Sequence, residues 1–145
     1  MANENLAKAA DLLRSGKLVA IPTETVYGLA ADARNPDAVA RIFEVKQRPA
    51  FDPLIIHLAS ADEASAYAQG IGPRFEKLYA AFSPGPLTYI LPKTTAVPNL
   101  VTAGHPTVAL RFPNHPLTRQ LLQDLKFPLA APSANMFGRV SPVTA

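Results

Sequence analysis

Short apolar runs of strand character alternate along this chain with stretches of helical periodicity. KLVAIP, PLIIHL, LTYILP and TVALRFP are rich in β-branched or aromatic residues, and each contains a proline at or near one end. Between these runs, apolar residues recur every three or four positions. Strands and helices mixed in this way predict an α/β or α+β domain, with a twisted, open, mixed sheet and flanking helices. A chain of 145 residues fits one such domain, 1–145.

Five stretches have the periodicity of amphipathic helices. They are NENLAKAADLLRSG, the segment from Asn35 to about Lys46, ADEASAYA, PRFEKLYAAF and HPLTRQLLQDL. Asn35 and Ser60 are the expected N-caps of the second and third helices. In the last helix we expect the four leucines to pack inward: Leu117, Leu121, Leu122 and Leu125. PTETVYGLAADA predicts a turn and a second strand after KLVAIP, and PLAAP predicts a last strand.

The chain contains no cysteine, which excludes disulfides, thiol nucleophiles and cysteine-based zinc sites. The start, MANENLAKAADLL, has no basic segment followed by an apolar core, and no long apolar run occurs anywhere. The expected setting is therefore the cytoplasm, without a membrane span.

Charge is distributed unevenly between the two halves. Through residue 72 there are seven Lys/Arg and nine Asp/Glu, whereas the rest contains seven and two. A basic second half favours an anionic ligand such as a nucleotide, pyrophosphate or RNA. A solubilising surface explains the same asymmetry equally well.

Neither common phosphate-binding loop is present, because the sequence has no G-x-x-x-x-G-K-[ST] and no G-x-G-x-x-G. Lys46 and Arg48, in a segment stiffened by prolines, offer a positive charge and a two-pronged guanidinium to phosphate or carboxylate oxygens. The alternative is a pair of surface cations at the end of a helix, where the helix dipole favours them.

Several other positions each carry a weak signal. Gly85 lies between two prolines in a rigid corner before a strand, and Arg111 ends an apolar strand, where α/β sheets place ligands. A lone arginine is more often part of a surface salt bridge. The small polar residues of APSANMFGRVSP could form an anion nest or a plain turn. The histidines lack metal-ligand spacing, and His57 within an apolar strand is more often a core residue.

Taken in order, five segments resemble the YrdC-like family, the threonylcarbamoyl-adenylate synthases. They are PTETVYGL, KQRPAFDPLIIHL, PGPLTYIL, VALRFP and APSANMFGRVSP, and the resemblance runs from Leu18 to Ala145. The K-x-R pair followed much later by S-x-N is the signature of this family. The resemblance implies an open α/β sheet around a concave, positively charged cavity.

The resemblance also implies a reaction. Proteins like this combine L-threonine, bicarbonate and ATP, release pyrophosphate and leave threonylcarbamoyl-AMP, which partner proteins use to modify certain tRNAs. Magnesium would be bound through the ATP phosphates, so no metal site made by protein side chains is expected. Such chemistry requires positioned anions and neutralised charge rather than an acid-base pair.

Site residues follow from the matching motifs. The resemblance implies ATP contacts from Lys46, Arg48, Asp52, Thr107, Ser133, Asn135 and Ser141, with Lys46 and Arg48 facing the triphosphate as the catalytic pair. It implies threonine contacts from Thr25, Tyr27, His57, Arg111 and Ala131. Arg111 is expected to clamp the threonine carboxylate.

Two other functions remain open on the sequence. One is an RNA-binding module without catalysis, and the other is a carbamoyl-transfer domain of the hydrogenase-maturation type. Related enzymes continue beyond the S-x-N segment into further strands, whereas this chain stops at Ala145. We therefore expect a YrdC-like domain that lacks the C-terminal strands of the family.

Overall fold

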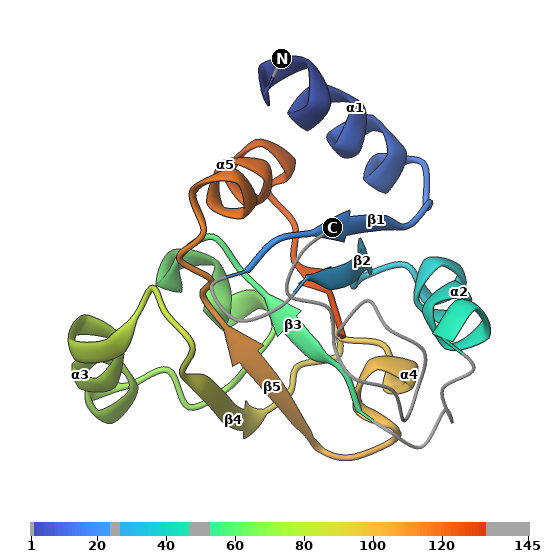
Figure 1. Ribbon diagram of the computed structural model, residues 1–145. Coiled ribbons are helices and arrows are strands. Elements are labelled where there is room, and N and C mark those ends of the chain that lie inside the picture. The colour runs from blue at the N-terminus through green and yellow to red at the C-terminus, as the bar shows by residue number, and fades with distance from the viewer. Residues whose placement is uncertain (1, 24–26, 47–52, 133–145) are drawn as a thin grey trace.

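A computed structural model describes residues 2–23, 27–46 and 53–132 of the chain (Figure 1). Its helices are α1 (Ala2–Arg14), α2 (Pro36–Lys46), the 3₁₀ helix η1 (Ala61–Ala66), α3 (Pro73–Phe82), α4 (Asn99–Thr102) and α5 (Pro116–Leu125). Its strands are β1 (Val19–Ile21), β2 (Gly28–Asp32), β3 (Ile55–His57), β4 (Thr88–Pro92), β5 (Thr107–Arg111) and β6 (Leu129–Ala130). The mixed α/β class predicted from the sequence is confirmed.

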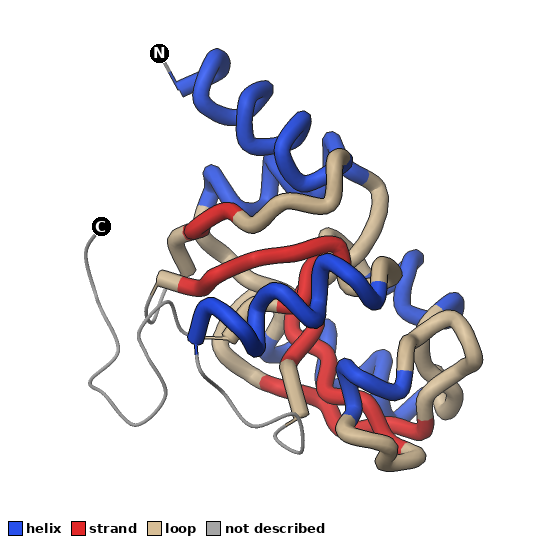
Figure 2. Tube along the Cα trace, turned by 90° about the vertical axis from the view of Figure 1, so that its right-hand side faces the viewer, coloured by secondary structure: helices blue, strands red, loops and turns tan. Residues whose placement is uncertain are grey.

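The six strands form one mixed sheet in the order β1-β2-β6-β3-β5-β4. β3 and β5 are parallel, and the other neighbouring strands are antiparallel. Consequently β2, β3 and β5 run in the same direction, and β6, though last in sequence, lies between β2 and β3. In Figure 1, α1 lies at the top of the molecule and β4 near the bottom. The view turned by 90° also has the helix that follows the N-terminus at the top (Figure 2).

One face of the sheet is covered from β2 to β4. The strand registers place Ala31, Ala130, Ile56, Leu110 and Tyr89 side by side on this face. These side chains belong to a single buried cluster, to which α2, η1, α3 and α4 contribute apolar residues. This cluster is the main core of the domain.

The opposite face is covered over only part of its width. Over β1, β2 and β6, the helices α1 and α5 bury Ile21, Ala30 and Leu129 in a second cluster. Over β3, β5 and β4 the same face carries Ile55, Thr88, Ile90, Thr107 and Ala109, which are half-buried or exposed. We call these five residues the open patch.

Most predicted elements are confirmed, and Asn35 caps α2 as expected. Its side-chain oxygen accepts hydrogen bonds from the backbone amides of Asp37 and Ala38 at 3.0 and 3.3 Å. Within the described ranges, no helix is long and apolar enough to cross a membrane.

Three expectations are wrong. The third helix is a 3₁₀ helix, and the Ser60 side chain makes no capping hydrogen bond to it. Leu117 does not pack inward but is 42% exposed, because it lies in the first turn of α5 at the rim of a groove between that helix, α1 and β1. The short helix α4 was not predicted, since its four residues are too few to show a helical period.

Candidate functional site

The predicted site residues fall at two ends of the sheet. Since β2, β3 and β5 run in the same direction, Tyr27 and Thr107 lie at the end where these strands begin. Ala131 follows the antiparallel β6 and lies at the same end. His57 and Arg111 end β3 and β5 and lie at the opposite end. The open patch connects the two groups.

Lys46 is brought to the first of these ends by α2. A short turn, in which the Asn35 amide donates to the Asp32 carbonyl at 3.1 Å, reverses the chain after β2. The helix then packs back along β2, and its 11 residues extend about 16 Å, roughly the length of that strand. Lys46, the last of them, is only 2% exposed. Lys46 therefore ends a helix, as the alternative expects, but it is buried rather than on the surface.

His57 and Arg111 are direct partners in the register of the parallel strands β3 and β5. They therefore share a face, and both are buried, with 2% and 8% exposure. The Arg111 side chain donates from Nε to the Gly85 carbonyl at 3.2 Å, so the alternative of a surface salt bridge is wrong. The burial of His57 agrees with the alternative of a core histidine. Its register nevertheless places it beside the predicted carboxylate clamp.

Backbone contacts join the stretch after Tyr27 to the end of β6. The Leu29 amide donates to the Pro132 carbonyl at 2.8 Å, and the Ala131 amide donates to the Ile55 carbonyl at 3.2 Å. A β-carbon at Gly28 would lie 3.3 Å from the β-carbon of Ala131. Because the Ala131 amide is used within the sheet, any backbone contact that this residue makes with a ligand has to use its carbonyl oxygen.

These positions form an elongated strip rather than a point. Thr107 and Arg111 lie four residues apart on one face of β5, a separation of about 13 Å. Thr107 lies at one end of this strip and the His57–Arg111 pair at the other. Lys46 ends α2, which packs on the main-core face, and lies at the same end of the sheet as Thr107. A ligand with two anionic groups some distance apart would match this arrangement. Six predicted site residues lie outside the described residues and remain predictions: Thr25, Arg48, Asp52, Ser133, Asn135 and Ser141.

One carboxylate near the strip is already neutralised. Asp32 ends β2 and accepts hydrogen bonds from Nε and Nη2 of Arg34 at 3.1 and 3.0 Å. This bond raises the pKa of the Arg34 guanidinium above its ordinary value, although burial opposes the shift. The guanidinium also stacks over Phe127, 4.2 Å from the ring centroid. The sequence did not predict this pair, because a D-x-R spacing alone does not signal an ion pair.

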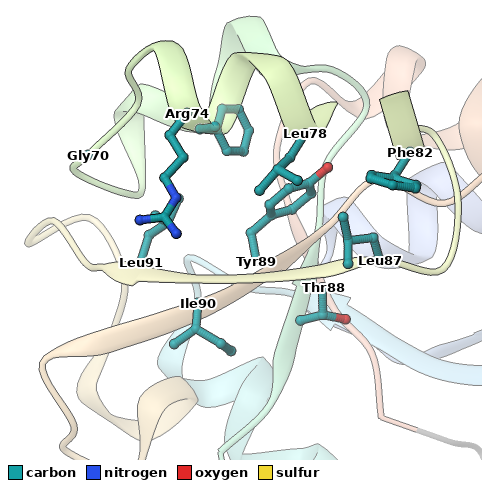
Figure 3. A pocket seen from close by; sticks show the side chains of 10 residues that line it. Gly70, Arg74, Leu78, Phe82, Leu87, Thr88, Tyr89, Ile90 and Leu91 are labelled. Carbon is teal, nitrogen blue, oxygen red and sulfur yellow. The ribbon is translucent and has the colours of Figure 1, made fainter. Parts of the chain in front are cut away.

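A separate cavity of about 510 Å³ lies between α3 and β4 (Figure 3). Its walls are mainly apolar, with Phe75, Leu78, Phe82 and Leu87 among them, and Arg74 is its one charged side chain. Figure 3 shows Leu87, Tyr89 and Leu91 on the α3 side of β4, with Thr88 and Ile90 on the other. The cavity is therefore mostly on the opposite side of β4 from the open patch, and its walls do not suit a phosphate.

Comparisons with known proteins show which family and which structures this chain resembles. The Sua5–YciO–YrdC family model, described as telomere recombination, matches residues 11–145. A threonylcarbamoyl-AMP synthase of Pyrococcus abyssi is 51% identical over 137 residues, which are 94% of this chain and 40% of that protein. A threonylcarbamoyl-AMP synthase of Bacillus subtilis is 48% identical over 97% of this chain and 41% of its own length.

A solved structure has the same architecture. The crystal structure of P. abyssi Sua5 complexed with L-threonine superposes with a TM-score of 0.95 at 49% identity, covering 98% of this chain and 42% of that one. The chain thus spans about two fifths of the length of these relatives. The likeness extends over nearly all of the sheet and helices described above.

Proposed function

The chain belongs to the Sua5–YciO–YrdC family, and from this we propose that it carries the site for making threonylcarbamoyl-AMP from L-threonine, bicarbonate and ATP. The observation that carries the proposal is the pairing of buried Arg111 with His57 at one end of the sheet, with the buried Lys46 at the other end. The related Sua5 of P. abyssi was crystallised with L-threonine. The relatives from P. abyssi and B. subtilis are named threonylcarbamoyl-AMP synthase.

Arg111 and His57 would receive the threonine, and Lys46 with Arg48 would receive the phosphates. A guanidinium offers several N–H donors in one plane and suits the threonine carboxylate. The threonine amine and bicarbonate would give a carbamate and water. A carbamate oxygen would then attack the α-phosphorus of ATP, forming the new O–P bond while the bond to pyrophosphate breaks. The protein would contribute mainly alignment and positive charge.

Magnesium is expected to arrive on the ATP phosphates. Among the residues that the structure describes, no group of three or more His, Asp or Glu side chains is placed to hold a metal ion. Asp32, the carboxylate at the end of β2, is bonded to Arg34. Phosphate oxygens and water would therefore be the principal ligands, and the ion would neutralise charge on the phosphates.

The product would be passed on in the cell. We propose that proteins of tRNA modification receive the adenylate in the cytoplasm and use it on tRNA. Direct contact between this chain and tRNA is a further possibility that the basic second half favours.

The test is the variant Arg111→Lys, with Arg74→Lys as the matched control. Lysine keeps the charge but loses the planar fork, so the KM for L-threonine should rise about tenfold or more, with the KM for ATP nearly unchanged. Arg74 is exposed on α3, in the apolar cavity, and its replacement should change neither constant. Adenylate formation is followed with magnesium, bicarbonate and both substrates. A change in the KM for ATP alone, with the KM for L-threonine unchanged, would overturn the placement of threonine at Arg111.

A further inference from the structure

The corner Ser83–Pro86 makes two hydrogen bonds to the end of β5 through one residue. The Gly85 carbonyl accepts from Arg111 Nε at 3.2 Å, and the Gly85 amide donates to the carbonyl of Phe112 at 2.7 Å. The two partners of Gly85 are thus consecutive residues of the chain. A hydrogen bond from Nε restricts rotation of the guanidinium plane, because Nε is one of the three nitrogens in that plane.

The corner itself is held in place by its neighbours. The Ser83 amide donates to the Tyr79 carbonyl at the end of α3, at 2.9 Å. The hydroxyls of Ser83 and Tyr89 are 2.6 Å apart. Phe112 is fully buried, and its ring packs edge-on against Tyr79 at 4.9 Å. The Gly85 carbonyl is therefore attached to the core of the domain and not to a free loop.

Position 85 admits only glycine in this geometry. A β-carbon there would lie 2.7 Å from the backbone oxygen of Phe82, closer than real contacts allow. Backbone atoms at the end of α3 cannot move aside as the tip of a side chain can. Any larger residue would displace the corner and the carbonyl that Arg111 uses.

We propose that Gly85 is a positioning residue for Arg111: its carbonyl sets the orientation in which the guanidinium meets the carboxylate of the amino-acid substrate. The proposal rests on the proposed function, in which Arg111 binds threonine. Gly85 would thus be a determinant of amino-acid binding that lies 26 positions from Arg111, in the segment that links α3 to β4. Replacing Gly85 should therefore weaken amino-acid binding through Arg111 and leave ATP binding intact.

The test compares Gly85→Ala with Gly72→Ala in the intact chain. Gly72 caps α3, and a β-carbon there would meet nothing within 4 Å. Isothermal titration calorimetry with L-threonine should show a dissociation constant raised about tenfold in Gly85→Ala. ATP should bind within twofold of the original affinity, and Gly72→Ala should change neither. Unchanged threonine affinity in folded Gly85→Ala would overturn the proposal.

A double variant separates positioning from general damage. If Gly85 acts through Arg111, then Gly85→Ala with Arg111→Lys should bind threonine about as weakly as Arg111→Lys alone. If the double variant instead raised the dissociation constant by the product of the two single-variant factors, Gly85 would not act through Arg111. If Arg111→Lys alone leaves threonine affinity unchanged, the proposed function itself fails, and this outcome is distinct from failure at Gly85.

A measurement on the unaltered chain covers the case in which Gly85→Ala does not fold. In a ¹⁵N NMR spectrum, the arginine Nε–H signal that disappears in Arg111→Lys belongs to Arg111. The bond to Gly85 predicts slow exchange of this proton with water. Exchange as fast as that of an exposed arginine would contradict the bond and, with it, the positioning role.

Discussion

The two halves of one sheet face differ sharply in how they are covered. Over β1, β2 and β6, α1 and α5 seal the face, and Ala30 and Leu129 have no exposure. Over β3, β5 and β4, Ile90 is 63% exposed and Ala109 is half-buried. In the strands of both halves, residues that point into the main core alternate with residues that point to the second face. The difference lies in which segments the chain supplies to cover the second face.

Three of the predicted binding residues border or belong to the uncovered half. His57 and Arg111 border it at one end, and Thr107 belongs to it at the other. Helices packed on a sheet face leave less of it accessible to a ligand, whereas an uncovered face beside buried cations can bind one. The comparison therefore assigns stability to the sealed half and to the main core, and ligand binding to the open half. Substitutions can test each part of this assignment.

The largest effect is expected at the predicted cationic pair, Lys46 and Arg48. Arg48→Ala should abolish adenylate formation, and Lys46→Met should reduce it at least about a hundredfold, because each removes a charge from the triphosphate. Methionine keeps most of the apolar length of Lys46, and a cooperative thermal unfolding transition checks that the variant is folded. Lys77→Met, on the exposed side of α3, is the matched control and should retain full activity. Normal turnover by folded Lys46→Met would remove Lys46 from the site.

A stability measurement compares the two faces of a single strand. Leu110 is fully buried in the main core, so Leu110→Ala should lower the free energy of unfolding by about 2–5 kcal/mol. Its neighbour Ala109 belongs to the open patch, and Ala109→Ser should change that free energy by less than about 0.5 kcal/mol. Urea unfolding gives both values. Equal losses would show that the open patch is packed as tightly as the core.

Local patterns predicted the fold wherever a segment is long and its apolar residues are periodic. PRFEKLYAAF coincides with α3, and the cap at Asn35 coincides with the start of α2. The pattern failed where packing between distant segments decides. Leu117 has the spacing of an inward residue, yet its turn of α5 borders the groove with α1 and β1. ADEASAYA has a helical composition but closes into a 3₁₀ helix.

The site was predictable in part. The family resemblance named Arg111 and His57, and the register of β3 and β5 brings them together. Without the resemblance, Arg111 was a single charge at the end of a strand. Its bond to Gly85 could not be predicted, because it joins a side chain to a backbone carbonyl 26 residues away and leaves no mark on either local sequence.

The smallest expected effect concerns the main core at high pH. Tyr67 is half-buried against the main core, and burial raises the pKa of its hydroxyl above the ordinary value of 10.0, although Arg34 opposes the shift. The folded protein therefore holds this proton more tightly than the unfolded chain, so the contribution of Tyr67 is complete below pH 10 and is lost as the pH rises through the raised pKa. Urea unfolding between pH 8 and 11 should show a fall in stability that is smaller in Tyr67→Phe. Adenylate formation at neutral pH should be the same in both proteins, since Tyr67 lies outside the strip. A variant with the same pH dependence as the original chain would show that Tyr67 titrates alike in both states, and reduced activity would extend the ligand site beyond the open half.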